Sequence, residues 1–241
     1  MATTMAATCS YFVTGTDTEV GKTLISSALL QMLSHRGLRT AGMKPVAAGA
    51  VMRDGVWHNE DVDHLEAESS LALPQALTAP YLLRTAAAPH IAADLENIAI
   101  DAQHIRSCYD QIAAAADAVV VEGVGGFRVP LSDHFDTADL AEELGLPVIL
   151  VIGLRLGCLN HALLTADAVA ARGLTLAGWV VNGVTPEMPY AEANVAALSA
   201  RLHAPPLGAV PWLAVPSPIA AADYLDFSCL PGWPGVRSGS L

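Results

Sequence analysis

The stretch Gly15-Thr-Asp-Thr-Glu-Val-Gly21-Lys22-Thr23 follows a short apolar run and leads directly into the helical pattern LISSALLQML. A strand, a loop ending in Gly-Lys-Thr and a helix, in this order, predict a phosphate-binding loop, because backbone N–H groups at a helix start attract phosphate oxygens. In such a loop Lys22 reaches the outer phosphates and the Thr23 hydroxyl binds Mg²⁺. The loop is a variant, since its first glycine stands one residue farther from Gly21 than in the common pattern.

The rest of the chain alternates short apolar runs with longer amphipathic stretches rich in Ala and Leu. This pattern predicts strands near Tyr11–Thr14, Thr40–Met43, Ala118–Val121, Val148–Ile152, Leu176–Val181 and Leu207–Val210. It predicts helices near Lys22–Ser34, Asp61–Ser69, Ala102–Ala115, Thr137–Leu144, Asn160–Ala171 and Ala191–Leu202. Apolar strands such as AVVV and VILVI indicate burial on both faces, as in a parallel sheet covered by helices. We therefore expect one α/β domain of the P-loop NTPase type over residues 1–241, with 1–8 and about 216–241 loosely held.

Composition narrows the possible partners. At 241 residues, with 53% hydrophobic and 15% charged side chains, the chain can fold around a core and is not expected to be disordered. Its formal charge of -12 opposes binding to nucleic acid or to an anionic membrane. The apolar run Leu146–Leu154 is too short to span a bilayer, and the first ten residues carry no basic side chain, so neither an anchor nor a leader peptide is expected. Four widely spaced cysteines indicate reduced thiols and favour a cytoplasmic location.

Three further residues are candidates for the same site. Glu122 ends the apolar run AVVV and precedes a Gly-rich loop, so we interpret it as a magnesium ligand, because an unpaired buried carboxylate would be costly. Lys44 follows the strand TAGM and could stabilise charge on a transferred phosphoryl group, but position alone favours a solvated surface lysine. Asp61 lies in NEDVDHLE, where a helix cap or an exposed face is the simpler interpretation.

Seven segments resemble the dethiobiotin synthetase family in the same order along the chain to about Leu213: FVTGTDTEVGKT, AGMKPVAAG, VEGVGG, LPVILV, LGCLNHALLTA, LTLAGWVVN and PLGAVPWLA. The most specific are TDTEVGKT joined to AG-x-KPV, and the LGC-x-NHA-x-LTA run. The resemblance implies a ligase that uses ATP and Mg²⁺ to close a cyclic urea from 7,8-diaminononanoate and CO2, giving dethiobiotin, ADP and phosphate in biotin synthesis. It also implies a homodimer and small-molecule substrates, with no covalent nucleophile.

The resemblance also implies roles for individual residues. It places Thr23, Asp61 and Glu122 around the magnesium. It makes Lys44 the active-site lysine, which reverses the surface interpretation, and places it with Lys22 and Thr18 near the phosphoryl and carbamate oxygens. The residues implied to line the nucleotide site are Glu19, Val20, Gly21, Lys22, Thr23, Leu24, Asp61, Glu122, Gly123, Val124, Gly125, Asn182, Gly183, Pro211, Trp212 and Leu213.

Two of these assignments have plain alternatives. Asn182 with Gly183 would contact the adenine, yet an Asn-Gly pair after a strand is also a common turn signal. The segment Leu156, Gly157, Cys158, Leu159 and Asn160 matches the family's dimer contact, where a helix start meets the carboxylate of the diamine bound mainly to the other subunit. From the residues alone, Asn160 could equally be an ordinary helix N-cap.

The chain departs from the family at Ala48, where KPV-x-S-G normally supplies a serine hydroxyl to the diamine or its carbamate. A methyl group donates no hydrogen bond, so we expect water or the backbone to replace it, at a cost of at most ~1–3 kcal/mol. Arg128 adds a cation beside the glycine loop, and residues 215–218 lack the carboxylate that some relatives place near the adenine. Looser selectivity for the base is therefore expected.

Three other functions are less consistent with the sequence. A regulatory or partitioning ATPase switch of the phosphate-loop lineage typically carries a second lysine early in the loop, where this chain has Asp17. An amide ligase of the cobyric-acid type needs a glutaminase domain, and fewer than thirty residues follow Leu213. A metal-delivery GTPase should show a His-rich or Cys-rich segment and N-K-x-D, and this sequence has neither. The ligase is the preferred interpretation, with the switch as the alternative.

Overall fold

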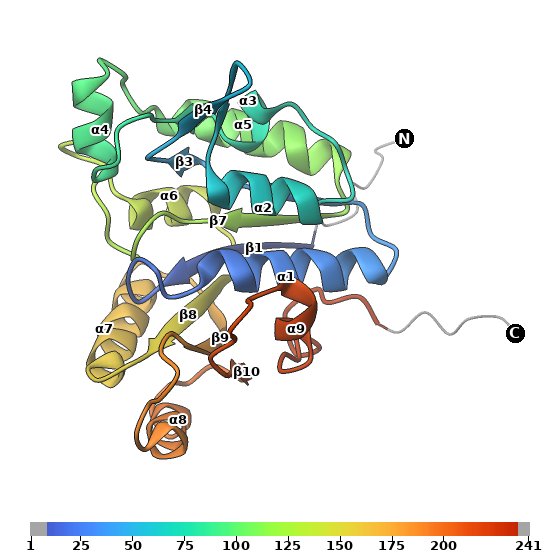
Figure 1. Ribbon diagram of the computed structural model, residues 1–241, viewed down its shortest axis with the longest axis vertical. Helices are drawn as coiled ribbons and strands as arrows, with labels where there is room; N and C mark the ends of the chain where they lie inside the picture. Colours follow the sequence, from blue (N-terminus) through green and yellow to red (C-terminus); the bar gives the residue numbers. More distant parts are fainter. Residues whose placement is uncertain (1–8, 236–241) are drawn as a thin grey trace, which may run out of the picture.

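The sheet places the phosphate loop at its centre. A computed structural model describes residues 9–235, in which six parallel strands lie in the order β10-β9-β8-β1-β7-β2 (Figure 1). These are β1 (Cys9–Gly15), β2 (Thr40–Met43), β7 (Ala118–Glu122), β8 (Val148–Leu154), β9 (Leu176–Gly183) and β10 (Pro206–Val210). β1 pairs with β7 on one side and with β8 on the other. The order in which strands are added to the sheet therefore reverses beside β1. Ligands bind at such a point, at the carboxyl ends of the strands.

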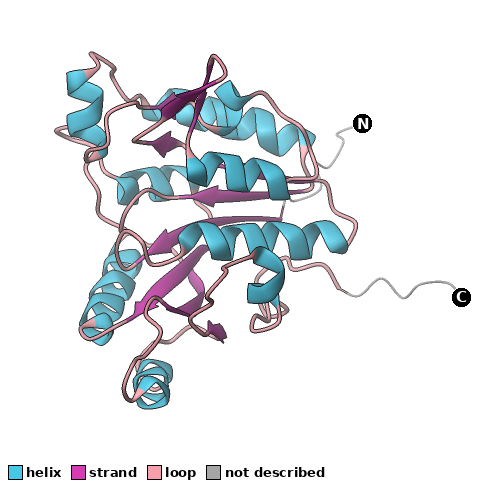
Figure 2. Cartoon of the chain, in the orientation of Figure 1, coloured by secondary structure: helices cyan, strands magenta, loops and turns pink. Residues whose placement is uncertain are grey.

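Helices cover both faces of this sheet, as the continuous apolar strands predict (Figure 2). One face is covered by α1 (Lys22–His35) and α9 (Pro218–Ala222), and the other by α5 (Ala102–Ala115), α6 (Thr137–Leu144), α7 (Cys158–Ala171) and α8 (Ala191–Ser199). Alternate residues of β1 serve the two cores: Tyr11 contacts the α1 side, whereas Phe12 contacts the α5 side. The predicted parallel α/β fold of the P-loop type is therefore confirmed.

Several small elements between β2 and α5 were not predicted: β3 (Val46–Ala47), β4 (Val51–Arg53), β5 (Val56–His58), α3 (Gln75–Thr78), β6 (Tyr81–Leu82) and α4 (Pro89–Leu95). The helix predicted at Asp61–Ser69 is present as α2 (Glu60–Glu68). Strands β4 and β5 form an antiparallel hairpin whose turn has Asp54 at φ 49° and Gly55 at φ 83°. Two positive φ values at an Asp-Gly pair are typical of a type I′ hairpin turn. This hairpin and α2 follow the Lys44 loop and carry Asp61 back to the edge of the sheet.

The expectation of a loose end does not hold for residues 216–235. Phe227 is fully buried and Leu230 nearly so, in the core between the sheet and α1. The Tyr11 hydroxyl donates to the carbonyl of Pro231 at 2.9 Å, which fixes this segment to the central strand. The many prolines and glycines of this segment predict a poorly packed end, but its apolar side chains are buried together in one core cluster. The rest of that expectation concerns residues 1–8 and 236–241, which lie outside the described residues.

Helices of the described chain are short or polar compared with what a bilayer requires. Within residues 9–235, none has the length and the apolar character needed to cross a membrane.

Candidate functional site

The loop after β1 has the backbone of a phosphate cradle. Gly21 is the N-cap of α1 with φ +92°, and a Cβ there would come within 2.2 Å of the Asn182 amide nitrogen, so only glycine fits. Glu19 also has a positive φ of 56°. No side chain of residues 9–235 caps the start of α1. The backbone N–H groups at this helix start are therefore available to an anion.

Lys22 is buried and points back along the loop. Its Nζ donates to the backbone carbonyl of Asp17 at 3.1 Å, and its side chain is 6% exposed. Burial, followed by the nearby charge of Lys44, lowers the pKa of Lys22 to about 8. A lysine in this position can respond strongly to an incoming anion, because phosphate oxygens would restore the stability of its charged form.

Lys44 lies in the middle of the site, not on the surface. Its Nζ is 2.7 Å from Oδ2 of Asp61, 2.7 Å from Oε1 of Glu122 and 3.1 Å from the carbonyl of Gly123. Lys44 follows the last residue of β2 and is only 3% exposed. The interpretation of Lys44 as a surface lysine is therefore wrong. Burial opposes its charge, but the two carboxylates outweigh burial and raise the pKa of Lys44.

Asp61 and Glu122 face each other across this ammonium. Asp61 lies in the first turn of α2, whose N-cap is Asn59, so the interpretation of Asp61 as a helix cap is wrong. Glu122 ends β7 and is fully buried. Burial opposes the charge of Asp61, but its contacts with Lys44 prevail and lower the pKa of Asp61. Four separate elements thus bring two carboxylates, a lysine and Thr23 together.

The oxygens of this cluster suit a magnesium ion. Thr23 Oγ1 lies 2.6 Å from Oδ1 of Asp61 and 3.0 Å from Oε1 of Glu122. Oε2 of Glu122 is buried and has no hydrogen-bond partner within residues 9–235. A hydroxyl and two carboxylates are hard oxygen donors of the kind Mg²⁺ takes alongside phosphate oxygens. No group of three or more His, Cys, Asp or Glu in residues 9–235 could hold a metal by itself, so phosphate and water oxygens would have to complete the shell.

A cavity of about 1110 Å³ opens over this cluster. Its lining includes polar residues, among them Thr18, Glu19, Lys22, Lys44 and Asp61. The lining also includes small apolar residues: Ala47, Ala48, Ala86, Ala87, Ala88, Pro89, Val124 and Val129. Sequence reasoning missed the segment 86–89, whose only signal was Pro89 as the first residue of α4. The cavity can therefore accept a molecule with a charged part and an apolar part.

Ala48 lines this cavity, and its contact with the diamine stays a prediction. Its backbone carbonyl accepts from Nδ2 of Asn59 at 3.1 Å, which ties the Lys44 loop to the start of α2. Asn59 also lines the cavity, so it brings a polar side chain close to the position where the family has serine.

The residues predicted to surround the base fall into two contacting segments. Asn182 is buried within β9, so the turn alternative is wrong, and its amide donates to the carbonyl of Val20 at 3.0 Å. A Cβ on Gly183 would lie 2.4 Å from the backbone nitrogen of Trp212, which explains why glycine is needed there. Leu24 lines a smaller cavity of about 320 Å³ beside Thr23. Asn182 thus braces the phosphate loop, and its contact with adenine stays a prediction.

The segment 156–160 lies apart from the main cavity. Leu156 is 94% exposed, and none of these five residues lines the large cavity. Helix α7 begins at Cys158 after Gly157 in a left-handed conformation with φ +95°, so the N-cap is Gly157 and the alternative that placed it at Asn160 is wrong. An exposed helix start away from the rest of the site fits a contact with a second molecule.

Two charged residues singled out in the sequence are paired. Arg128 forms an ion pair with Asp136, the N-cap of α6, so it is not a free cation beside the glycine loop. Asp17 forms an ion pair with Arg155, at the end of β8.

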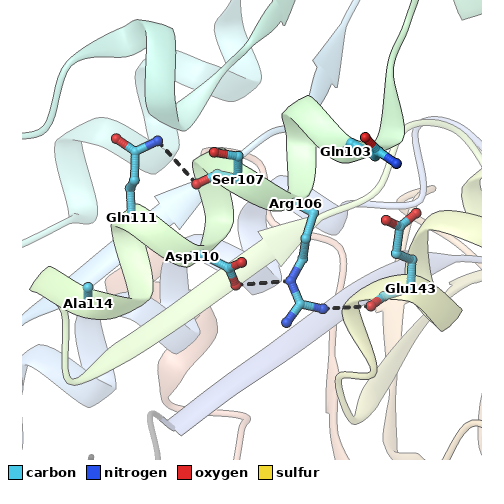
Figure 3. Close-up of a pocket in the computed structure, with 7 residues that line it drawn as sticks. All are labelled: Gln103, Arg106, Ser107, Asp110, Gln111, Ala114 and Glu143. Carbon is cyan, nitrogen blue, oxygen red and sulfur yellow. Dashed lines mark hydrogen bonds and ion pairs between the residues drawn. The ribbon is translucent and has the colours of Figure 1, made fainter.

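Another pocket lies on α5 and α6, where Arg106 donates to Asp110 and to the backbone carbonyl of Glu143 (Figure 3). It shares no residue with the cavity over the phosphate loop. Its polar groups are exposed, which favours a solvated surface hollow.

Comparison with known proteins gives two kinds of similarity. Among solved structures, the MinC:MinD cell division protein complex of Aquifex aeolicus has a TM-score of 0.57 at 13% identity, covering 90% of this chain and 91% of that one. The septum site-determining protein MinD of Pyrococcus horikoshii OT3, complexed with Mg-ADP, has a TM-score of 0.54 at 17% identity, covering 91% and 87%. At such identities the likeness concerns the fold alone.

Sequence similarity is much closer. A protein-family model described as an AAA domain matches residues 10–219. The ATP-dependent dethiobiotin synthetase BioD of Janthinobacterium sp. (strain Marseille) is 64% identical over 234 residues, which cover 95% of this chain and 99% of that protein. The chain belongs to the dethiobiotin synthetase family.

Proposed function

We propose that this protein closes the ureido ring of dethiobiotin from 7,8-diaminononanoate and CO2, with ATP converted to ADP and phosphate. The observation that carries the proposal is the contact of Lys44 with Asp61 and Glu122 beside the phosphate loop, next to a cavity lined by both polar and small apolar residues. The polar lining residues suit phosphates and a carbamate, and the apolar lining residues suit an alkyl chain. The 64% identical relative, named as an ATP-dependent dethiobiotin synthetase, supports the same reaction.

The reaction needs positioning and charge neutralisation more than a nucleophile from the protein. One amine of the substrate takes up CO2 and loses a proton, which gives a carbamate. A carbamate oxygen then attacks the γ-phosphorus of ATP and ADP leaves. The second amine attacks the carbamic-phosphoric anhydride, releases phosphate and closes the ring.

The chain's own residues would assist each step electrostatically. Lys22, whose Nζ donates to the Asp17 carbonyl in this structure, would turn to the phosphate oxygens instead. Lys44, held in place by two carboxylates, would face the oxygen shared between the carbamate and the transferred phosphoryl group. Thr18, at the rim of the cavity, would hydrogen-bond the carbamate. The apolar segment 86–89 would exclude water from the anhydride.

Thr23, Asp61 and Glu122 would hold magnesium, as their oxygens and the unpartnered Glu122 Oε2 suggest. When bound, the ion would supply positive charge to the phosphate oxygens. Binding would require Lys44 to share the two carboxylates with it.

We also propose a homodimer in the cytoplasm. The exposed Leu156 and the α7 start lie outside the cavity of their own chain, which supports a role at a partner's site. All four cysteines are free thiols, which fits a reducing compartment.

One experiment separates the ligase from the alternative ATPase switch. The pure protein is incubated with ATP, Mg²⁺, labelled bicarbonate and 7,8-diaminononanoate, and labelled cyclic urea is sought by mass spectrometry. The expected result is labelled product formed together with ADP, only when the diamine is present. ATP hydrolysis that is independent of the diamine, without labelled product, would favour the switch.

A further inference from the structure

Asp17 makes contacts in two directions, and the proposed reaction does not use its carboxylate. Its backbone carbonyl accepts from Lys22 Nζ at 3.1 Å, inside the phosphate loop. Its carboxylate accepts from the Thr18 N–H at 2.7 Å and forms the ion pair with Arg155. One residue therefore contacts the phosphate-binding lysine on one side and a separate segment of the chain on the other.

Arg155 stands where β8 turns into α7. The end of β8 already lies against the loop: the Thr16 N–H donates to the Val151 carbonyl at 3.0 Å, and a Cβ on Gly153 would lie 2.8 Å from the Val20 side chain. The Arg155 carbonyl accepts from the Cys158 N–H at 3.0 Å, which closes the turn that begins α7. The side chain of Arg155 is thus the polar link between this turn and the phosphate loop.

We propose that Asp17 and Arg155 are a positioning pair that links occupancy of the phosphate loop to the conformation of the first turn of α7. The inference rests on the proposed binding of nucleotide at that loop. Arg155 already pairs with Asp17, and phosphates that attract Lys22 bring further negative charge next to this pair, so the guanidinium and the turn are held more firmly. The start of α7 lies in the segment 156–160, which is expected to contact the second molecule. Nucleotide bound at one site would therefore order the segment that contacts the other site.

The strength of the coupling depends on how exposed the two side chains are to water. Both side chains of the pair are 44% exposed, so water screens their attraction. An exposed ion pair corresponds to a change of about twofold to fivefold in an equilibrium constant. The pair should therefore bias the turn without locking it.

Hydrogen exchange of the full chain, followed by mass spectrometry with and without AMP-PNP and MgCl2, tests the link. In the wild type, the nucleotide should slow exchange in peptides covering 13–24 and 154–161, the latter by about twofold to fivefold. In Arg155→Gln and Asp17→Asn, peptide 13–24 should still be protected, but the slowing in 154–161 should disappear. Arg155→Lys, which keeps the charge, should restore it.

A matched control is available on α5. Arg106 is an exposed arginine that pairs with Asp110 at 2.9 Å (Figure 3). The variant Arg106→Gln should behave as the wild type. Equal slowing of 154–161 in the wild type and in Arg155→Gln would overturn the link, as would its absence in the wild type while 13–24 is protected. No protection of 13–24 in the wild type would overturn nucleotide binding itself, and the link with it.

Discussion

The ammonium of Lys44 lies 2.7 Å from Oε1 of Glu122, and neither group is open to solvent, since the two side chains are 3% and 0% exposed. A buried pair of this kind contributes little net stability when intact, but removing one partner leaves an uncompensated charge. Substituting one or both members of this pair therefore distinguishes the effect of the charges on stability from their effect on the rate.

Lys44→Gln should lower kcat by ~10²-fold or more, because the transferred group loses a fixed positive charge. It should also destabilise the protein by about 3–5 kcal/mol, because Glu122 is left buried and unpaired. The double variant Lys44→Gln/Glu122→Gln should recover much of the stability but none of the rate. Steady-state kinetics and urea unfolding measure both, and an unchanged rate in the single variant would exclude a catalytic role for Lys44.

The affinity for nucleotide should fall above about pH 8. Burial lowers the pKa of Lys22 to about 8, below the ordinary lysine value, so free protein loses this charge above that pH. Phosphates raise that pKa when they bind; affinity is therefore constant below pH 8 and decreases by up to about tenfold per pH unit above it. Titration with AMP-PNP between pH 7 and 9.5 measures the effect. Lys22→Arg, which stays charged, should give a flat profile.

The lowered pKa of Lys22 also makes the free energy of unfolding depend on pH, in the direction opposite to that expected for a lysine whose pKa is raised by a salt bridge. A lowered folded pKa means that the unfolded chain binds more protons between about pH 8 and the ordinary lysine value, so Lys22 should add stability as pH rises through this window. Its contribution is the difference between the wild type and Lys22→Met in urea unfolding at pH 7 and pH 9.5. A difference that does not change with pH would contradict the lowered pKa.

Asp61→Asn should weaken the response to magnesium more than it weakens folding. Asp61 Oδ1 accepts from Thr23, and Asn can keep this contact, but the charge that favours a divalent ion is lost. The Mg²⁺ concentration for half-maximal rate should rise by about tenfold or more. Activity titrated with MgCl2 in EDTA-treated protein measures this. Asp63→Asn, on the same helix, is the matched control and should leave the titration unchanged.

Ala48→Ser restores the residue usual in the family and tests whether its absence matters. Asn59 already brings a polar side chain to this part of the cavity, so kcat/KM for the diamine should change by less than about tenfold. A gain of several hundredfold would show that the site of this chain is impaired.

The strands and the phosphate loop could be predicted because their signals are local. An apolar run followed by Gly-x-Gly or Gly-Lys-Thr fixes β1, β7 and the start of α1 without knowledge of the rest of the chain. The hairpin at 51–58 could also have been found, since Asp54-Gly55 is a strong turn signal.

Lys44 and Asp61 could not be assigned from position, because burial depends on which elements meet. Lys44 and Glu122 are separated by 78 residues, and Asp17 and Arg155 by 138. Nothing in the local pattern tells a buried lysine from an exposed one, so only the family resemblance favoured a site role for Lys44. The segment 86–89, which lines the cavity, could not be predicted either, since alanines carry no chemical signal.

The position of β1 constrains how this protein is made. β1 is synthesised first among the described elements, yet its partners are β7, from Ala118, and β8, from Val148. At ordinary rates of translation, roughly 5–20 s pass before the first of these partners emerges. During that time an apolar strand, later wholly enclosed, has no neighbour with which to pair. The nascent chain should therefore depend on chaperones during synthesis, and the phosphate loop can form only after most of the polypeptide has left the ribosome.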